Sequence, residues 1–304
     1  MRAPGPAGGK LPPVKPLAPL VLLAALCGCA THPPELPPPA AGKPTVALVL
    51  GGGAVRGFAH IGVIKLLDIM EIRPDIIVGT SAGSVAGVLY AAGIDGFRLQ
   101  EMAWELDQGM VADWSVFGKG LIRGKALEDY INRAVEGRTL ERLKRRFACV
   151  GTRLSNGEAV LFRAGNPGRA VRASSSVPGV FEPVQIDGHE YVDGGLVSPV
   201  PIRFARELGA DFVIAVDVAS TPLRESHNST VDVMLKSYTI MGQTIRAAEL
   251  PLADVVITPQ LDKVDSADFA AKNQAIIAGE RAALAAIPVI RTKLAAWTPP
   301  AGRP

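Results

Sequence analysis

A serine lies in a tight, glycine-flanked turn, a setting in which serine can act as a nucleophile. The Gly-x-Ser-x-Gly motif at residues 79–83 follows a short apolar run at 76–78 and precedes a segment, 84–92, with helical character. Strand, tight turn and helix in this order are the context of a nucleophile elbow. Gly79 and Gly83 let the backbone turn sharply, and Ser81 would lie at the positive end of a helix dipole. The alternative is a surface loop that matches the motif by chance.

A second glycine cluster, at residues 51–57, follows an apolar strand at 46–50 and precedes a helix whose apolar face begins at Phe58. A glycine loop between strand and helix can point several backbone N–H groups at one anion. A bound phosphate is disfavoured because the spacing is not Gly-x-Gly-x-x-Gly and no Gly-Lys-Ser follows. The oxyanion of a hydrolase is the favoured ligand. Arg56 would either hold a phosphate-bearing substrate or brace the loop.

An acid followed by two glycines is the third candidate for chemistry. Asp193 leaves a predicted hairpin (184–186 and 189–192), and Gly194 and Gly195 would let its carboxylate lie against another backbone. The alternative is a turn with a solvated aspartate. His60, in the helix after the glycine loop, is a possible base, but a packed and hydrogen-bonded role is favoured.

The remaining elements predict how these residues are positioned. Apolar strands alternate with helices, which predicts an α/β/α layered fold with a mainly parallel central sheet. Asn-Gly and Asp-Gly turns predict antiparallel hairpins at one side of that sheet. Ligand groups gather at the carboxyl ends of parallel strands, where the glycine loop and Ser81 fall. The expected strands and hairpin arms are 46–50, 76–78, 147–152, 158–163, 184–186, 189–192, 212–218 and 254–259, with a last helix at 267–294.

The segment 107–123 carries more apolar side chains than a loop normally does, among them Trp114 and Phe117. It would either cover a groove that binds an acyl chain or fill the core of the domain.

The first 44 residues predict export and tethering. Residues 1–28 resemble a signal peptide, with a few basic residues before the apolar run 17–26. That run ends in a sequence similar to a bacterial lipobox, which makes Cys29 the expected lipidated residue. Residues 29–44 form a proline-rich tether, and residues 45–304 form the folded domain, with its last helix and tail at about 266–304. Thr31 at the second position after Cys29 is typical of sorting to the outer membrane, facing the periplasm.

Composition excludes several classes of function. A net charge of +3 without a basic stripe disfavours nucleic acid as a partner. Three cysteines, two of them at 27 and 29, form neither a disulfide framework nor a metal site, so we expect no metal and no cofactor. Cys149 is expected to pack in the core. The sequence leaves protein partners open.

Taken together, three blocks resemble the signatures of the patatin-like phospholipase family. They are residues 51–57, 79–83 and 193–195, and further stretches at 59–63, 173–181 and 195–201 are also similar to the family. The resemblance covers about residues 45–260 and implies a patatin-like α/β/α fold. Many members carry Gly where Ala54 stands and Asn where Ser198 stands.

The resemblance implies a lipid acyl hydrolase that cleaves membrane lipids or lysolipids and needs no metal. Ser81 would be the nucleophile and Asp193 the proton acceptor. The N–H groups of Gly51, Gly52 and Gly53 would form the oxyanion hole. The other motif positions are Arg56, Gly57, Gly79, Gly83, Gly194 and Gly195.

Two other functions compete with this one. An α/β-hydrolase triad needs a histidine after Ser81 and the acid, and only His227 follows Asp193, while His189 precedes it. A lipid-binding lipoprotein with a relic site is the non-enzymatic alternative.

Overall fold

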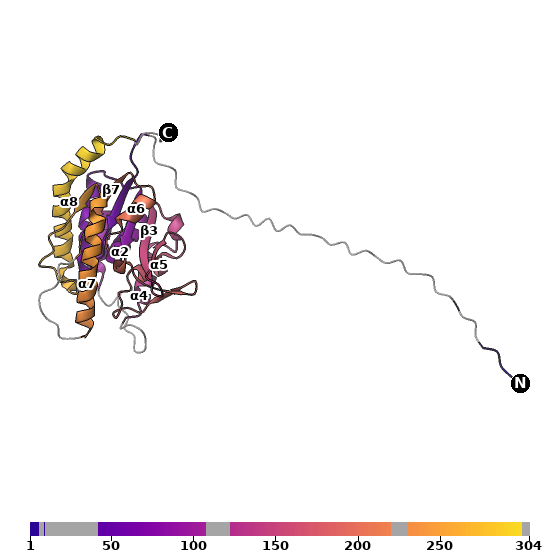
Figure 1. Ribbon diagram of the computed structural model, residues 1–304. Helices are drawn as coiled ribbons and strands as arrows, with labels where there is room; N and C mark the ends of the chain where they lie inside the picture. The colour runs from indigo at the N-terminus through magenta and orange to yellow at the C-terminus, as the bar shows by residue number, and fades with distance from the viewer. Residues whose placement is uncertain (6–8, 10–41, 108–121, 220–229, 300–304) are drawn as a thin grey trace. The chain divides into compact units, whose positions relative to one another are not determined.

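The computed structural model describes residues 1–5, 9, 42–107, 122–219 and 230–299. The chain separates into residues 1–32 and 33–304, and every helix and strand described below belongs to the second unit (Figure 1). The predicted signal peptide, Cys29 and nearly all of the tether lie outside the described residues, as do 108–121 and 220–229. Within the described part, no helix is long and apolar enough to cross a bilayer.

An eight-stranded sheet with the order β5-β6-β3-β2-β1-β7-β8 forms the centre, and β4 pairs with β3. Neighbouring pairs among β1, β2, β3, β7 and β8 are parallel, whereas β4, β5 and β6 form antiparallel pairs at the β3 side. This confirms the predicted parallel sheet with hairpins at one side. The strands are β1 (Val46–Leu50), β2 (Ile76–Thr80), β3 (Arg146–Arg153), β4 (Ala159–Phe162), β5 (Val184–Ile186), β6 (His189–Asp193), β7 (Phe212–Val216) and β8 (Val255–Ile257).

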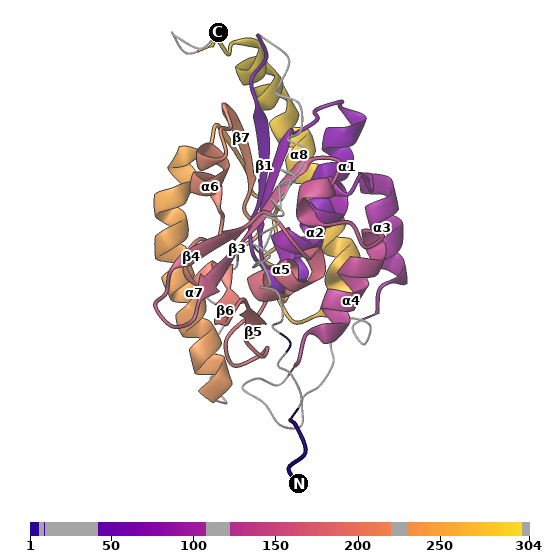
Figure 2. The same ribbon diagram turned by 90° about the vertical axis from the view of Figure 1, so that its right-hand side faces the viewer.

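Helices cover both faces of the sheet (Figure 2). One face carries α1 (Ala59–Ile69), α2 (Ala82–Ala91), α3 (Gly96–Glu105), α4 (Lys125–Ala134), α5 (Pro167–Ser174) and α8 (Lys272–Ala295), and the other carries α6 (Ile202–Glu207) and α7 (Thr230–Glu249). Strand β1 shows why both faces are covered. Leu48 and Leu50 pack into the larger core and Ala47 and Val49 into the smaller one, since alternate side chains point to opposite faces. Cys149 is buried in the larger core, as expected.

Most predicted elements are present, but the sequence analysis missed α7. This helix lies between β7 and β8, where no helix or strand was predicted. Glu249, which is buried, is its last residue. The helix predicted at 267–294 is shorter at its start, since a 3-10 turn at Phe269–Ala271 comes first.

Helices α1 and α8 are in very close contact. A Cβ built at Gly62 would lie 2.1 Å from the Ile276 carbonyl oxygen, and one at Gly279 would lie 2.0 Å from the Ala59 carbonyl oxygen. Both positions therefore exclude any side chain while the two helices keep this distance.

We expect Gly279→Ala to destabilise the protein by roughly 1–3 kcal/mol, because the added methyl group forces the helices apart. Gly242→Ala in α7 is the matched control, since the new Cβ would lie 3.6 Å from its nearest neighbour, Pro199 Cγ. There the gain in helix propensity should stabilise by about 0.5–1 kcal/mol. Urea unfolding followed by circular dichroism measures both. Equal stability of the two variants would contradict the close contact.

Candidate active site

Ser81 occupies the sharp turn between β2 and α2. Its φ of 53° and ψ of −125° are rare for a residue with a side chain, and such backbone strain costs about 1–3 kcal/mol. The flanking glycines make the turn possible by close approach. A Cβ at Gly79 would lie 2.6 Å from the Gly83 carbonyl oxygen, and one at Gly83 would lie 2.0 Å from that of Leu50.

Hydrogen bonds fix this turn. The Ser81 N–H donates to Ser174 Oγ at 3.0 Å, and Ser84 Oγ donates to the Ser81 carbonyl at 2.6 Å. Ser174 belongs to α5 and is fully buried. The 173–181 block thus holds the elbow, a role that the sequence analysis did not assign to it.

Strand β3 brings Asp193 beside the elbow. Residues 146–150 of β3 pair with β2, and the next residues, 151–153, pair with β6. Thr80 therefore lies opposite Val150, while Asp193 lies opposite Gly151, one residue further along β3. The end of β2, which Ser81 follows, and the end of β6, which is Asp193, consequently meet beside β3.

The Asp193 side chain is fully buried, and its two oxygens differ. Oδ1 accepts hydrogen bonds from the Gly195 N–H at 2.7 Å and from the Tyr238 hydroxyl at 3.0 Å. Oδ2 has no hydrogen-bond partner of standard geometry among the described residues. The Ser81 hydroxyl is nevertheless close enough to favour the carboxylate form.

Burial raises the pKa of Asp193 to about 6, because the charged form loses its hydration. Hydrogen bonds from Ser81, Gly195 and Tyr238 lower the pKa in part. The carboxylate is therefore a stronger base than a solvated aspartate and still ionises below neutral pH.

The glycine loop lies against Ser81, since a Cβ at Gly52 would be 3.3 Å from Ser81 Cβ. The N–H of Gly51 donates to the Val216 carbonyl at 3.0 Å, and that of Gly52 donates to the Pro199 carbonyl at 2.9 Å. Both amides are thus occupied in this conformation. Within the described residues, the N–H groups of Gly53 and Ala54 donate to nothing. The oxyanion role of the three glycines stays a prediction, and the structure favours Gly53 among them.

Arg56 and His60 brace the loop. The Arg56 side chain is 5 % exposed and donates from Nε to the Val264 carbonyl at 2.9 Å and from Nη1 to that of Ala219 at 3.4 Å. Of the two predicted roles for Arg56, these contacts favour bracing over binding a phosphate. His60 Nε2 donates to the Gly51 carbonyl at 2.8 Å, and burial lowers the pKa of His60 to about 4. His60 is therefore a neutral packing residue.

The remaining motif glycines permit close approach. A Cβ at Gly57 would lie 2.4 Å from Ala82 Cβ, and one at Gly194 would lie 2.2 Å from the Val150 carbonyl oxygen.

His189 is exposed at the β5–β6 turn, and His227 lies outside the described residues. No histidine of the described part hydrogen-bonds Ser81. In the same part, no group of three or more His, Cys, Asp or Glu is arranged to hold a metal ion.

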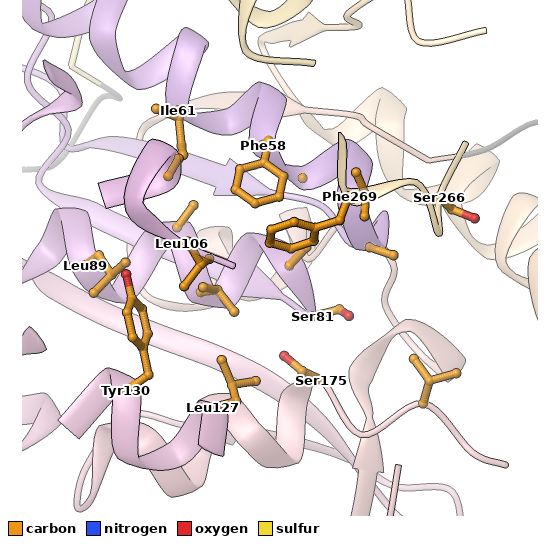
Figure 3. Close-up of a pocket in the computed structure, with 18 of the residues that line it drawn as sticks. Phe58, Ile61, Ser81, Leu89, Leu106, Leu127, Tyr130, Ser175, Ser266 and Phe269 are labelled. Carbon is orange, nitrogen blue, oxygen red and sulfur yellow. The ribbon is translucent and has the colours of Figure 1, made fainter. Parts of the chain in front are cut away.

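An apolar cavity of about 380 Å³ opens beside Ser81 (Figure 3). Among described residues, its lining includes no charged side chain, and its polar members are Ser81, Tyr130, Ser175 and Ser266. Figure 3 shows Ser81 and Ser175 close together, with Leu89 and Tyr130 at the opposite end of the cavity. The expectation that 107–123 covers this groove falls mostly outside the described residues. Ile122, at its end, lines the cavity.

Comparisons with known proteins agree with this architecture. The solved structure of VipD from Legionella pneumophila is similar with a TM-score of 0.55 and 14 % sequence identity, covering 80 % of this chain and 66 % of that one. At this identity, the likeness concerns the fold.

Two curated relatives are more similar in sequence. Human patatin-like phospholipase domain-containing protein 6 is 33 % identical over 230 residues, which cover 73 % of this chain and 16 % of that protein. An uncharacterised NTE family protein of Mycobacterium tuberculosis strain H37Rv is 38 % identical over 184 residues, or 58 % of this chain and 49 % of that protein. The chain thus spans less than half the length of these relatives.

The family model described as patatin-like phospholipase matches residues 48–206, which include the glycine loop, the elbow and Asp193. This match extends over more than half of the sequence, and the chain belongs to the patatin-like phospholipase family.

Proposed function

We propose that this protein is a serine hydrolase that cleaves acyl esters of membrane lipids, with Ser81 as nucleophile and Asp193 as its base. One observation carries the proposal: a strained serine stands at an apolar cavity, and a buried carboxylate keeps one oxygen without another partner beside it. Family membership supports the same chemistry. The relatives have longer chains, so the activity of those whole proteins is carried over to this chain only as part of the proposal.

The first half of the reaction forms an acyl-enzyme. As Ser81 Oγ attacks the ester carbonyl carbon, Asp193 Oδ2 accepts the hydroxyl proton. The carbonyl oxygen becomes an oxyanion, and the N–H of Gly53 would stabilise it. One such donor contributes about 3 kcal/mol to the transition state. When the tetrahedral intermediate collapses, the C–O bond of the ester breaks and the leaving alcohol takes the proton from Asp193.

The second half repeats these steps with water. Asp193 removes a proton from a water molecule that attacks the acyl carbon, and Ser81 Oγ leaves and recovers that proton. The fatty acid is released and the enzyme returns to its starting state. Asp193 thus acts as base and then as acid in each half.

The cavity favours a long acyl chain as the part of the substrate that is bound. Its apolar walls can remove methylene groups from water, which is worth about 0.8 kcal/mol for each one buried. The charged head group finds no charged side chain among the described residues of the cavity and is expected to remain outside. Membrane lipids and lysolipids both meet this requirement. Lipidation at Cys29 and attachment to the outer membrane stay predictions that would keep the enzyme near such substrates.

Ser81→Ala should abolish covalent labelling by a fluorophosphonate probe and reduce hydrolysis of p-nitrophenyl butyrate by ~10³-fold or more. Ser175→Ala is the control, because its hydroxyl lies in the same cavity close to Ser81. The control should still be labelled. Labelling that persists in Ser81→Ala, or well-folded wild type that is never labelled, would refute the proposal and favour a lipid-binding protein.

Activity should rise with pH through about 6, because Asp193 must be ionised to accept the Ser81 proton and its pKa is raised to about 6. Asp193→Asn should lose about 10²–10⁴-fold in kcat and this acid limb with it. Glu249→Gln is the matched control, since Glu249 is also buried and its pKa is about 7. The pH dependence of kcat/KM from pH 4.5 to 9 tests this. If the acid limb disappeared in Glu249→Gln, it would belong to Glu249, and its assignment to Asp193 would be wrong.

Leu89→Trp should shorten the acyl chains that the enzyme accepts, because the larger ring would fill the end of the cavity remote from Ser81 (Figure 3). We expect kcat/KM for p-nitrophenyl dodecanoate to fall by ~10-fold or more, and that for the butyrate ester to change little. Leu154→Trp, on the surface, controls for the new aromatic ring. A uniform loss over all chain lengths would show that the chain is bound elsewhere.

A further inference from the structure

We propose that Tyr238, on α7, is a positioning residue that holds the Asp193 carboxylate with Oδ2 toward Ser81. This inference rests on the proposed function. No motif in the sequence singles out Tyr238, because the helix that carries it was not predicted and Tyr238 lies 45 residues beyond the acid. Tyr238 is not among the residues that line the cavity, and its hydroxyl donates to the acid.

The hydrogen bonds to Asp193 determine which oxygen is left for chemistry. Tyr238 and the Gly195 N–H both donate to Oδ1, at 3.0 and 2.7 Å. Two donors on one oxygen prevent the carboxylate from rotating freely about its Cβ–Cγ bond. Oδ2 is therefore kept in place and without a competing donor among the described residues.

Gly195 explains how the tyrosine can reach the acid. A Cβ at residue 195 would lie 2.0 Å from the Tyr238 hydroxyl oxygen and 3.1 Å from Asp193 Oδ1. Residue 195 has no positive φ, so backbone conformation does not require a glycine there. A glycine is required because the phenol group of Tyr238 takes the space that a Cβ would need. The second glycine of the Asp-Gly-Gly motif is thus matched to a hydroxyl group on a distant helix.

Further contacts fasten α7 to the same segment. Glu249, at its last turn, accepts hydrogen bonds from Ser198 Oγ at 2.7 and 2.9 Å, and the Ser198 carbonyl accepts one from Thr80 Oγ1 at 2.9 Å. Arg246 pairs with Asp217 at 3.3 Å. Helix α7, the chain after Asp193 and the residue before Ser81 are therefore linked, which keeps the phenol group at a constant distance from the acid.

Few groups influence the charge of Asp193. The hydroxyl groups of Ser81 and Tyr238 and the N–H of Gly195 face its carboxylate, and no charged side chain contributes to its pKa among the described residues. From β3, Thr152 Oγ1 donates only to the backbone carbonyl of Asp193. Burial beside the acid raises the pKa of Tyr238 well above its usual value, so the phenol remains a donor at working pH. Removing that donor should raise the pKa of Asp193 further.

Tyr238→Phe tests the role, and Tyr90→Phe is its matched control. Tyr90 is also buried and donates to an aspartate, Asp68, at 2.6 Å, but it does not line the cavity. We expect Tyr238→Phe to move the acid limb of kcat/KM upward by about one pH unit. At pH 7, kcat for p-nitrophenyl butyrate should fall about 10-fold or more with KM nearly unchanged. Tyr90→Phe should leave the pH profile in place.

A double-mutant cycle adds a readout that a general loss of stability would not give. Gly195→Ala should reproduce the effect of Tyr238→Phe, because the methyl group displaces the hydroxyl. The two losses should then be far from additive. Additive losses, an unchanged acid limb in Tyr238→Phe or an equal shift in Tyr90→Phe would each overturn the inference.

A ¹³C NMR titration of Asp193, assigned with Asp193→Asn, separates this inference from the proposed function. It reports the carboxylate directly and requires no catalysis. Absence of fluorophosphonate labelling in wild type would refute the hydrolase proposal alone. A titration of Asp193 that is the same in wild type and Tyr238→Phe would refute the positioning role alone.

Discussion

The register of β3 is the constraint on which the site depends. One strand pairs with β2 along residues 146–150 and with β6 along 151–153, so that β2 and the antiparallel β6 meet end to end. Backbone hydrogen bonds thereby set the distance between Ser81 and Asp193, although more than a hundred residues separate them. A shift of one residue in the β3–β6 pairing would turn the acid to the other face of the sheet, because the side-chain period of a strand is two.

Burial of Asp193 has a free-energy cost, which the proposed mechanism would put to use. A carboxylate without charged partners is disfavoured in the interior, and its raised pKa expresses that cost. The same shift makes it a better base for a serine hydroxyl. Donors placed on Oδ1 keep the acid ionised near neutral pH, and they leave Oδ2 without a hydrogen-bond partner among the described residues. Desolvation thus raises the pKa of Asp193, and the hydrogen bonds to its carboxylate lower that pKa in part.

Close packing against backbone and side-chain atoms explains the glycines better than flexibility does. Gly57, Gly79, Gly83, Gly194 and Gly195 each stand where a Cβ would lie within 2.6 Å of another atom. They allow the glycine loop, the elbow and the segment after Asp193 to converge, and Arg56 and His60 then tie the loop through backbone carbonyls. Arg56 and His60 thus serve as structural braces.

Local sequence determined much of the fold, and it singled out Ser81 and Asp193 as candidates. Apolar runs bounded by glycine specify β1 and β2, Asn-Gly and Asp-Gly turns specify the hairpins, and the Gly-x-Ser-x-Gly context specifies the turn at Ser81, because each of these signals acts over a few neighbouring residues. Only the tertiary structure decided the contacts made over long separations. It occupied the amides of Gly51 and Gly52 with Val216 and Pro199, assigned Arg56 to bracing and brought Tyr238 to Asp193. Such contacts arise from strand register and helix packing, and no local pattern records which distant hydroxyl or carbonyl will fill a given space.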